Sequence, residues 1–226
     1  MKIDAATLDP GEIANWNGHA GLHFSQLGED CLLWHFFSGK WGGFYVDVGC
    51  HHPYRYSNTY LLHRFRGWKG INIDADRRAI ELFRKARPHD VNLNCGVGLE
   101  SGTRTLTVFN DGAVNTFDTG LAVRQSAHYA IAAQIEVPIL PLVSILEQHI
   151  VAGTDIDLIN IDCEGYDDAV VASNDWGKYS SRIVLVEIHG MNLENPTASP
   201  AVQRLRAAGY ILRAHYFATS VFERSS

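Results

Sequence analysis

The sequence predicts a doubly wound α/β fold with a mostly parallel sheet of seven strands. Short apolar runs rich in β-branched residues alternate with segments of helical periodicity, beginning with an apolar run over 44–48. After the last helix, expected over 200–208, the chain holds two more strand-like segments, over 210–216 and 220–224. Alternation of this kind places helices on both faces of an open sheet, and the two closing strands form a hairpin at its edge.

The remaining elements succeed one another at short intervals. Further strands are expected over 70–74, 90–97, 104–109, 135–140, 156–162 and 183–188. Helices are expected over 25–37, 58–66, 77–86 and 142–150, and another ends at Ser173. The N-cap candidates have side chains that can accept a hydrogen bond from the first free amides of a helix. They are Ser25, Ser57 or Asn58, and Asp76.

The composition is that of an ordinary globular protein. Of 226 residues, 46% are hydrophobic and 19% are charged. The length predicts a single domain over 24–226. The polar residues ahead of it, with Pro10 and several glycines, predict an arm over 1–23. Within the domain, the polar, glycine-containing stretch over 110–134 predicts a lid or substrate-recognition insertion, because long segments between core strands are more often functional than idle.

The charge and the apolar pattern argue against two classes of partner. A net charge of −6 and a pI near 6.0 leave no basic excess to neutralise phosphates, so a nucleic-acid binder is not expected. No apolar run approaches the length of a membrane span, and the first twenty residues lack the apolar core of a secretory signal. The four cysteines are scattered without metal-ligand spacing, which is typical of reduced thiols in the cytoplasm.

The stretch FYVDVGCHHP at 44–53 predicts a ligand site. Asp47 and Gly49 come at the carboxyl end of the first strand, where ligands of open α/β sheets bind. Gly49 lets the backbone approach a ligand because it has no Cβ. Asp74 ends the second strand, 27 residues after Asp47, where an acid of a βαβ unit binds ribose hydroxyls. These positions indicate a nucleotide-type cofactor, with Gly96 allowing an adenine to approach the third strand.

The four residues after Gly49 decide between cofactors. A dinucleotide fingerprint needs two more glycines at fixed spacing, but Cys-His-His-Pro stands there, and the chain has no phosphate-binding G-x-x-x-x-G-K-[ST] run. An Asp-x-Gly turn with an acid at the second strand suits S-adenosylmethionine, which has no pyrophosphate to cradle. An NAD-dependent oxidoreductase is therefore disfavoured.

Five motifs occur in order along the chain. They are SQLGED at 25–30, FYVDVGCHHP at 44–53, SNT at 57–59, GWKGINID at 67–74 and IDCEG at 161–165. Taken together they resemble the FkbM family of S-adenosylmethionine-dependent methyltransferases, over about residues 24 to 190. The resemblance implies the class I methyltransferase fold and O-methylation of a sugar or natural-product hydroxyl. In the last hairpin Ala218-Thr-Ser220 stands where many relatives have an Asn-Thr pair, so the acceptor pocket is expected to differ in detail.

The expected cofactor contacts come from the loops after the first four core strands and from the start of the first helix. They are Gln26, Asp47, Gly49, His51, Ser57, Asn58, Thr59, Asp74, Ala75, Cys95, Gly96 and Asp162. The amides at the start of the helix after the first strand face the same crevice.

The expected acceptor side lies at the ends of two central strands. Asp162 and Glu187 end these strands and should face one crevice, with His189 two residues further on. In the similar catechol-type O-methyltransferases, acids at these strand ends hold magnesium, so Asp162, Glu187 and His189 are the candidate metal ligands and catalytic residues. Mg²⁺ prefers oxygen ligands, which two carboxylates provide. The alternative needs no metal: His189 or an aspartate takes the proton from the hydroxyl.

The family resemblance implies an enzyme that methylates a hydroxyl of a sugar, polysaccharide or natural-product acceptor, and the cysteine pattern indicates the cytoplasm. One alternative is N-methylation of an amino sugar or small amine, which needs no metal. Another is a non-catalytic module that only binds the cofactor, but the chain keeps Asp47, Gly49, Asp162 and Glu187, which such a module could lose. A homodimer formed through the arm or the insertion is a further expectation.

Overall fold

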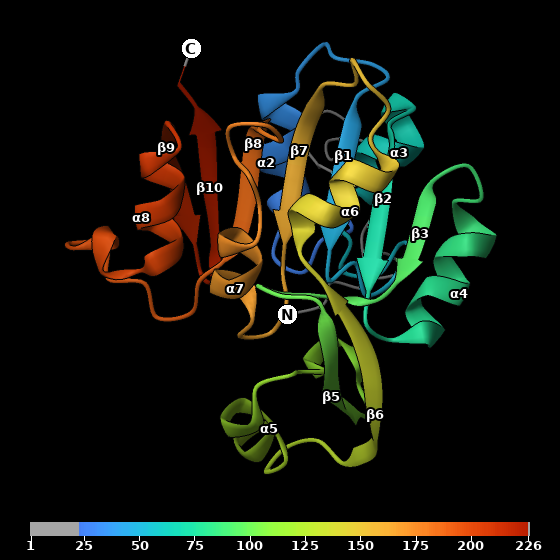
Figure 1. The fold of residues 1–226 in the computed structure, drawn as a ribbon. Coiled ribbons are helices and arrows are strands. Elements are labelled where there is room, and N and C mark those ends of the chain that lie inside the picture. The colour runs from blue at the N-terminus through green and yellow to red at the C-terminus, as the bar shows by residue number, and fades with distance from the viewer. Residues whose placement is uncertain (1–22, 226) are drawn as a thin grey trace, which may run out of the picture.

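The main sheet confirms the predicted fold class. The computed structural model of the protein describes residues 23–225, so the arm expected over 1–23 lies, but for its last residue, outside the described residues. Within this range seven strands form one sheet in the order β3-β2-β1-β7-β8-β10-β9 (Figure 1). The strands are β1 (Phe44–Val48), β2 (Lys69–Asp74), β3 (Val91–Asn94), β7 (Ile156–Ile161), β8 (Ser181–Glu187), β9 (Tyr210–Tyr216) and β10 (Thr219–Arg224). This order is that of a class I methyltransferase.

The strand directions agree with the expected hairpin ending. The pairs β1–β2, β1–β7, β2–β3 and β7–β8 are parallel, whereas β10 runs antiparallel to both β8 and β9. In the centre of the sheet Val46 is in register with Ile71 of β2 and with Ile159 of β7. The carboxyl ends of five parallel strands therefore share one edge of the sheet.

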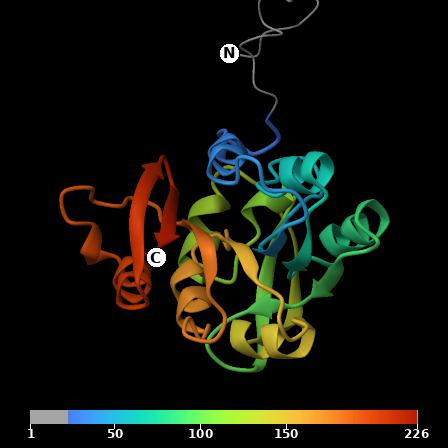
Figure 2. The same cartoon turned by 90° about the horizontal axis from the view of Figure 1, so that it is seen from above.

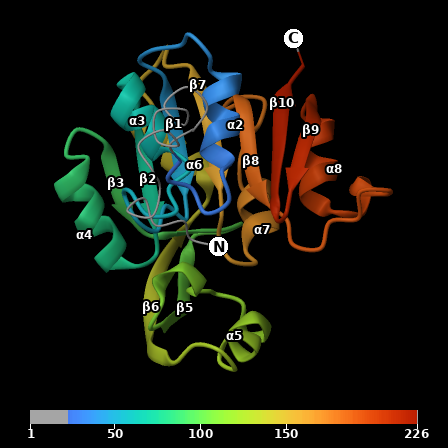
Figure 3. The same cartoon turned by 180° about the vertical axis from the view of Figure 1, so that it is seen from behind.

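Helices cover both faces of this sheet (Figures 1 and 2). They are α2 (Glu29–Phe36), α3 (Tyr60–Arg66), α4 (Arg77–Ala86), α6 (Leu142–His149), α7 (Asp167–Ala172) and α8 (Pro200–Ala207). On one face, α6, α7 and α8 pack against alternate strand residues such as Val46 and Val184. On the other face, seen from the front in Figure 3, α2 and α3 pack against Tyr45 and Leu185. The alternation follows from the two-residue period of a strand.

Two helix starts differ from those predicted, and a third agrees. The first helix begins at Glu29, and Ser25 is not its N-cap. The Ser25 hydroxyl instead donates to Asp30 Oδ1 at 2.7 Å and accepts the amides of Gly28 and Asp30, which fixes a turn ahead of the helix. At α3 the N-cap position is Thr59. At α4 the expected cap is present, because Asp76 accepts the amide of Arg78 at 2.9 Å.

A second, three-stranded sheet carries the insertion. The strand expected over 90–97 is broken at Cys95, so that β4 (Gly96–Val97) pairs with β6 (Ile131–Leu140) and not with the main sheet. β6 also pairs antiparallel with β5 (Gly102–Phe109), and the two project from the edge that holds the carboxyl ends of the parallel strands (Figures 1 and 3). β6 begins at Ile131, ahead of the strand expected over 135–140, so residues 131–134 of the segment predicted over 110–134 belong to this strand. The connection between β5 and β6 holds the rest of the insertion. It contains the 3-10 turn η2 (Gly112–Val114) and helix α5 (Thr119–Gln125).

The remaining connection between β8 and α8 holds the 3-10 turn η3 (Pro196–Ala198). Among the described residues, no helix has the length and apolarity needed to cross a membrane.

Candidate functional site

A pocket opens at the carboxyl ends of β1, β2, β3 and β7, where the sequence places most of its predicted site residues. Of the expected cofactor contacts, all except Thr59 line this pocket. The lining residues among them are Gln26, Asp47, Gly49, His51, Ser57, Asn58, Asp74, Ala75, Cys95, Gly96 and Asp162. Glu187 also lines it, while the lining does not include His189. The parallel arrangement explains this convergence, because it brings the carboxyl ends of separate strands together.

Asp47 organises the floor of the pocket. Asp47 is 2% exposed. Its Oδ2 atom accepts a hydrogen bond from the Thr59 hydroxyl at 2.7 Å, and its Oδ1 atom accepts one from the side-chain amide of Asn160 at 2.8 Å. Burial raises the pKa of Asp47. Thr59, which does not line the pocket, thus acts on it through Asp47. Both oxygens of Asp47 are therefore used in joining β1 to β7 and to the loop before α3.

Gly49 cannot be replaced by a residue with a side chain. Its φ is +77°, and a Cβ placed there would lie 1.7 Å from the carbonyl oxygen of Asp162. The turn after β1 thus passes directly against the end of β7, and only glycine permits both the backbone conformation and this approach.

Asp74 lies at the end of β2 with its carboxylate facing two backbone amides. Oδ2 accepts the amide of His51 at 2.8 Å, and Oδ1 accepts that of Asp76 at 2.7 Å. Burial raises the pKa of Asp74 to about 6. Its second lone pairs can accept the hydroxyls of a ligand, since each carboxylate oxygen takes more than one donor.

The two histidines after Gly49 have separate roles. His52 Nδ1 accepts the amides of Tyr54 and Arg55, so it holds the turn. His51 has φ +51°, and its Nε2 atom is buried without a hydrogen-bond partner in the described part of the chain. A buried polar atom of this kind needs a partner, and a bound ligand can supply one. His51 is thus the histidine that lines the pocket.

One wall of the pocket comes from the insertion. Gly112, Ala113, Asn115 and Phe117 line it. The sequence predicts a lid or substrate-recognition insertion over 110–134, but it names none of these four as a site residue. The Asn115 amide nitrogen donates to Asp76 Oδ2 at 3.2 Å, and this contact fixes the wall against the loop after β2. The sequence signal for this wall is the length of the connection, which is unusual between core strands and contains Asn115-Thr-Phe117.

A cluster of acids with one histidine lies at the ends of β7 and β8. One ligand atom from each of Glu164, Glu187 and His189 lies within 4.8 Å of the others. His189 Nε2 is 3.0 Å from Glu187 Oε1, and Glu187 Oε2 is buried with no hydrogen-bond partner among the described residues. The predicted group was Asp162, Glu187 and His189. The structure places Glu164 in it, and Asp162 lies beside it on the pocket wall.

Glu164 reaches the cluster because of its backbone. Its φ is +47°, a left-handed conformation that is unusual for a residue with a side chain, and its carbonyl oxygen accepts the Thr116 hydroxyl at 2.7 Å. The next helix, α7, has Tyr166 at its N-cap position and no side-chain cap. The Asp167 carboxylate accepts the amides of Cys163 and Gly165, which holds the turn ahead of this helix.

The cluster is electrostatically unusual. Burial and the negative charge of Glu187 raise the pKa of Glu164 to about 8 and place that of Asp162 well above its usual range. A hydrogen bond to Glu187 raises the pKa of His189 to about 8. Perturbed carboxyl groups of this kind in a pocket are typical of functional sites.

The comparison with known families agrees with the geometry. Residues 47–212 match the model of the methyltransferase FkbM domain. The chain belongs to the FkbM methyltransferase family. No match is found among curated proteins. Among solved structures, the chain is similar to a TehB-like SAM-dependent methyltransferase from Corynebacterium glutamicum ATCC 13032 Kitasato, at 10% identity and a TM-score of 0.43, with 95% of each chain covered.

This FkbM methyltransferase needs a pocket for its methyl donor, S-adenosylmethionine, and the residues present fit that molecule. Asp74, at the end of β2, has carboxylate oxygens that could accept hydrogen bonds from its ribose hydroxyls. Gly49 lets the backbone after β1 pass close to the end of β7. His51 lines the pocket between them, and its Nε2 atom has no partner among the described residues. Toward β7 and α2, Gln26 and Asp162 offer groups for an amino acid end.

Proposed function

We propose that this FkbM methyltransferase transfers a methyl group from S-adenosylmethionine to a hydroxyl of a sugar, polysaccharide or natural-product acceptor. The observation that supports it is the cluster of Glu164, Glu187 and His189 at the β7–β8 edge of the pocket. A neutral hydroxyl is a weak nucleophile, so its proton must be removed or its oxygen polarised before it attacks. The cluster offers groups for either task beside the place where the methyl donor would bind.

The pocket residues divide between the two ends of the donor. Asp74 is proposed to accept the ribose hydroxyls, and the backbone at Cys95 and Gly96 to flank the adenine. Gln26 and Asp162 are proposed to bind the amino acid end. The donor would supply the methyl group for an in-line displacement, in which positioning by these residues would supply much of the rate.

We propose that Glu164, Glu187 and His189 hold a divalent cation such as Mg²⁺. The buried, unpartnered Glu187 Oε2 is the atom that a cation would satisfy. When bound, the ion would supply Lewis-acid polarisation of the acceptor hydroxyl. Without a metal, the alternative is that His189 accepts the proton of the hydroxyl while Glu187, 3.0 Å from its Nε2, stabilises the resulting positive charge.

The acidic cluster also keeps N-methylation as a second candidate. An amino sugar or small amine carries a positive charge that the Glu187 carboxylate would attract. The two candidates differ in their requirement for metal, because an amine has a nucleophilic lone pair once it is deprotonated.

The proposed function is tested by titrating the protein with S-adenosylhomocysteine in a calorimeter, with NAD as the control ligand. We expect binding of S-adenosylhomocysteine and no binding of NAD. Transfer of labelled methyl groups from S-adenosylmethionine to matched hydroxyl and amine acceptors, with and without EDTA, then separates the two candidates. Binding of NAD in place of S-adenosylhomocysteine would refute the methyl donor assignment.

Replacing Glu164 by glutamine is expected to weaken the binding of Mn²⁺, used as a probe for the divalent site, by about tenfold or more, because one anionic oxygen ligand is lost. Electron paramagnetic resonance of free Mn²⁺ measures this directly. Glu147→Gln is the matched control, since Glu147 lies on the surface and pairs with Lys178. Equal Mn²⁺ affinity in the Glu164 variant and the wild type would remove the metal from the proposal.

The affinity for S-adenosylhomocysteine is expected to fall as the pH is lowered from 7 to 5. The pKa of Asp74 is raised to about 6, so the carboxylate that accepts the ribose hydroxyls is ionised above this pH and protonated below it. When protonated Asp74 binds the ligand weakly, the affinity at pH 5 is about tenfold lower than at pH 7, because only a minor fraction of Asp74 is still ionised. Asp74→Asn should bind weakly at both pH values. If Asp74→Asn keeps the full pH dependence of the affinity, another group is responsible for that dependence.

A further inference from the structure

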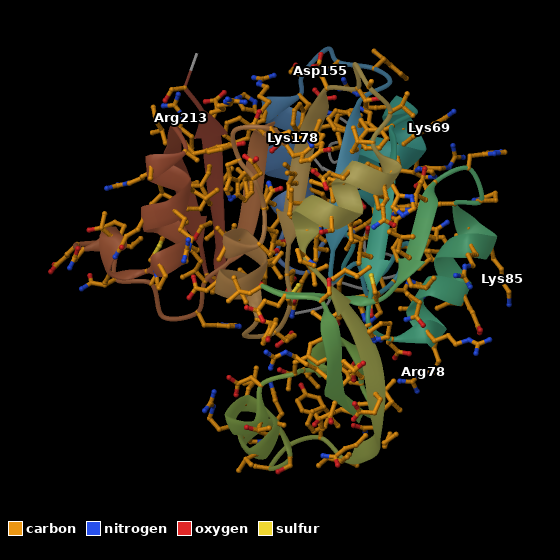
Figure 4. The ribbon with its side chains drawn as sticks, in the orientation of Figure 1. Lys69, Arg78, Lys85, Asp155, Lys178 and Arg213 are labelled. Atoms are coloured by element: carbon orange, nitrogen blue, oxygen red, sulfur yellow. The ribbon has the colours of Figure 1, made fainter. Side chains whose placement is uncertain are left out.

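Arg87 is a buried arginine at the end of α4, far from the pocket in sequence. Arg78 and Lys85 of the same helix extend into solvent (Figure 4), whereas Arg87 is 1% exposed. Its Nη1 atom donates to the Tyr45 hydroxyl at 2.7 Å and to the Thr59 hydroxyl at 2.9 Å. Burying a charged guanidinium is costly unless it is hydrogen-bonded and balanced by opposite charge.

The other terminal nitrogen of Arg87 holds the loop between β1 and α3. Nη2 donates to the carbonyl oxygen of Pro53 at 2.7 Å and to the Ser57 hydroxyl at 3.1 Å. The Ser57 hydroxyl in turn accepts the amide of Tyr60, the first residue of α3. One side chain therefore joins β1, the loop and the start of the next helix.

This loop is strained and lines the pocket. His51 and Tyr56 both have left-handed backbones, with φ of +51° and +59°, and both line the pocket. Such conformations cost free energy in residues with a side chain, so they persist only where surrounding contacts hold them. Between them, the Arg87 contact to the Pro53 carbonyl is one that the loop itself cannot supply.

The same side chain also acts on the carboxylate at the floor of the pocket. The Thr59 hydroxyl that accepts from Arg87 donates to Asp47 Oδ2 at 2.7 Å. The positive charge of Arg87 is near two buried acids, Asp47 and Asp90, and the Tyr45 hydroxyl donates to Asp90 Oδ2. These acids balance the buried charge. The network thus runs from Arg87 through Thr59 to the end of β1.

We infer that Arg87 is a positioning residue for the methyl donor: it holds residues 50–59 in the shape that binds the cofactor. The inference rests on the proposed cofactor pocket and goes beyond it, since Arg87 itself does not line the pocket. An arginine is needed because two nitrogens of one planar fork contact four oxygens, which the single ammonium of a lysine cannot do.

The test compares Arg87→Lys with the wild type in calorimetric titrations with S-adenosylhomocysteine. The variant should bind about tenfold more weakly or worse while it still unfolds cooperatively. Arg66→Lys is the matched control, because Arg66 is also buried, at 9% exposed, and donates to the carbonyl oxygens of Phe37 and Lys40 away from the loop. It should lower thermal stability and leave the dissociation constant within about twofold of the wild type.

A second readout needs no ligand. Hydrogen exchange of the amides in 50–59 should be faster in Arg87→Lys than in the wild type and unchanged in Arg66→Lys. Unchanged exchange in 50–59, or an unchanged dissociation constant in a folded Arg87→Lys protein, overturns the inference. Failure of the wild type to bind S-adenosylhomocysteine overturns the proposed cofactor instead. If Arg87→Lys does not fold, Tyr45→Phe removes one of the four contacts at a residue that does not line the pocket, and it carries the same two tests.

Discussion

Replacing Glu187 by alanine or glutamine is expected to abolish methyl transfer while leaving the affinity for S-adenosylhomocysteine unchanged. Glu187 ends β8 with one oxygen 3.0 Å from His189 and the other buried and, among the described residues, unpartnered. In the proposed function it acts on the reacting hydroxyl, either as a metal ligand or as the partner of a general base. A loss of roughly 10²- to 10⁴-fold in rate is expected for groups of this kind. Transfer of labelled methyl groups to the acceptor panel measures it.

The control for this prediction is Glu223→Gln. Glu223 lies on the edge hairpin, where it pairs with Arg213 and Arg182, and it does not line the pocket. Its variant should retain the full rate. Normal turnover in the Glu187 variants would show that the acceptor hydroxyl is activated elsewhere.

Replacing Asp74 by alanine is expected to weaken binding of S-adenosylhomocysteine by about 10- to 100-fold. Hydrogen bonds to a charged partner contribute about 1.5–3 kcal/mol each, and the ribose would lose its acceptor. The amides of His51 and Asp76, which Asp74 now accepts, would also lose their partner. Calorimetry gives the dissociation constant, and Asp74→Asn separates the loss of charge from the loss of the side chain.

Ser199→Ala is the control for the Asp74 prediction. Ser199 caps α8 by accepting the amide of Val202, and it is not part of the pocket lining. Its removal should cost about 1 kcal/mol of stability, as for other N-caps, with little change in affinity. Equal affinities in Asp74→Ala and the wild type would mean that the ribose is bound elsewhere.

The fold class and the location of the pocket could be predicted from the sequence alone. Apolar β-branched runs alternate with helical segments, and an acid ends the first, second, fourth and fifth core strands. Those acids, Asp47, Asp74, Asp162 and Glu187, line one pocket in the structure. The prediction was possible because parallel strands place their carboxyl ends at one edge of the sheet, independently of how the loops and helices between them are arranged.

Local pattern was less reliable at the ends of elements. Ser25 has the residue type of an N-cap, but its hydroxyl is used by Asp30, and the helix begins at Glu29. The strand expected over 90–97 divides at Cys95, because β4 pairs with a strand that begins only at Ile131, after the whole insertion. Periodicity describes which residues are apolar, and it does not show which strand they pair with.

The tertiary structure alone decided three features of the site: which residues of the insertion line the pocket, the place of Glu164 in the acidic cluster, and the contacts of Arg87 with the loop after β1. Glu164 has a left-handed backbone, with φ +47°, although it is not a glycine, so its residue type does not indicate this conformation. Its carbonyl oxygen accepts the hydroxyl of Thr116, which lies 48 residues earlier in the chain. Arg87 acts on residues 28 to 34 positions earlier in the chain. Contacts over such separations leave no period in the sequence, because they depend on how whole elements pack and not on the propensities of neighbouring residues.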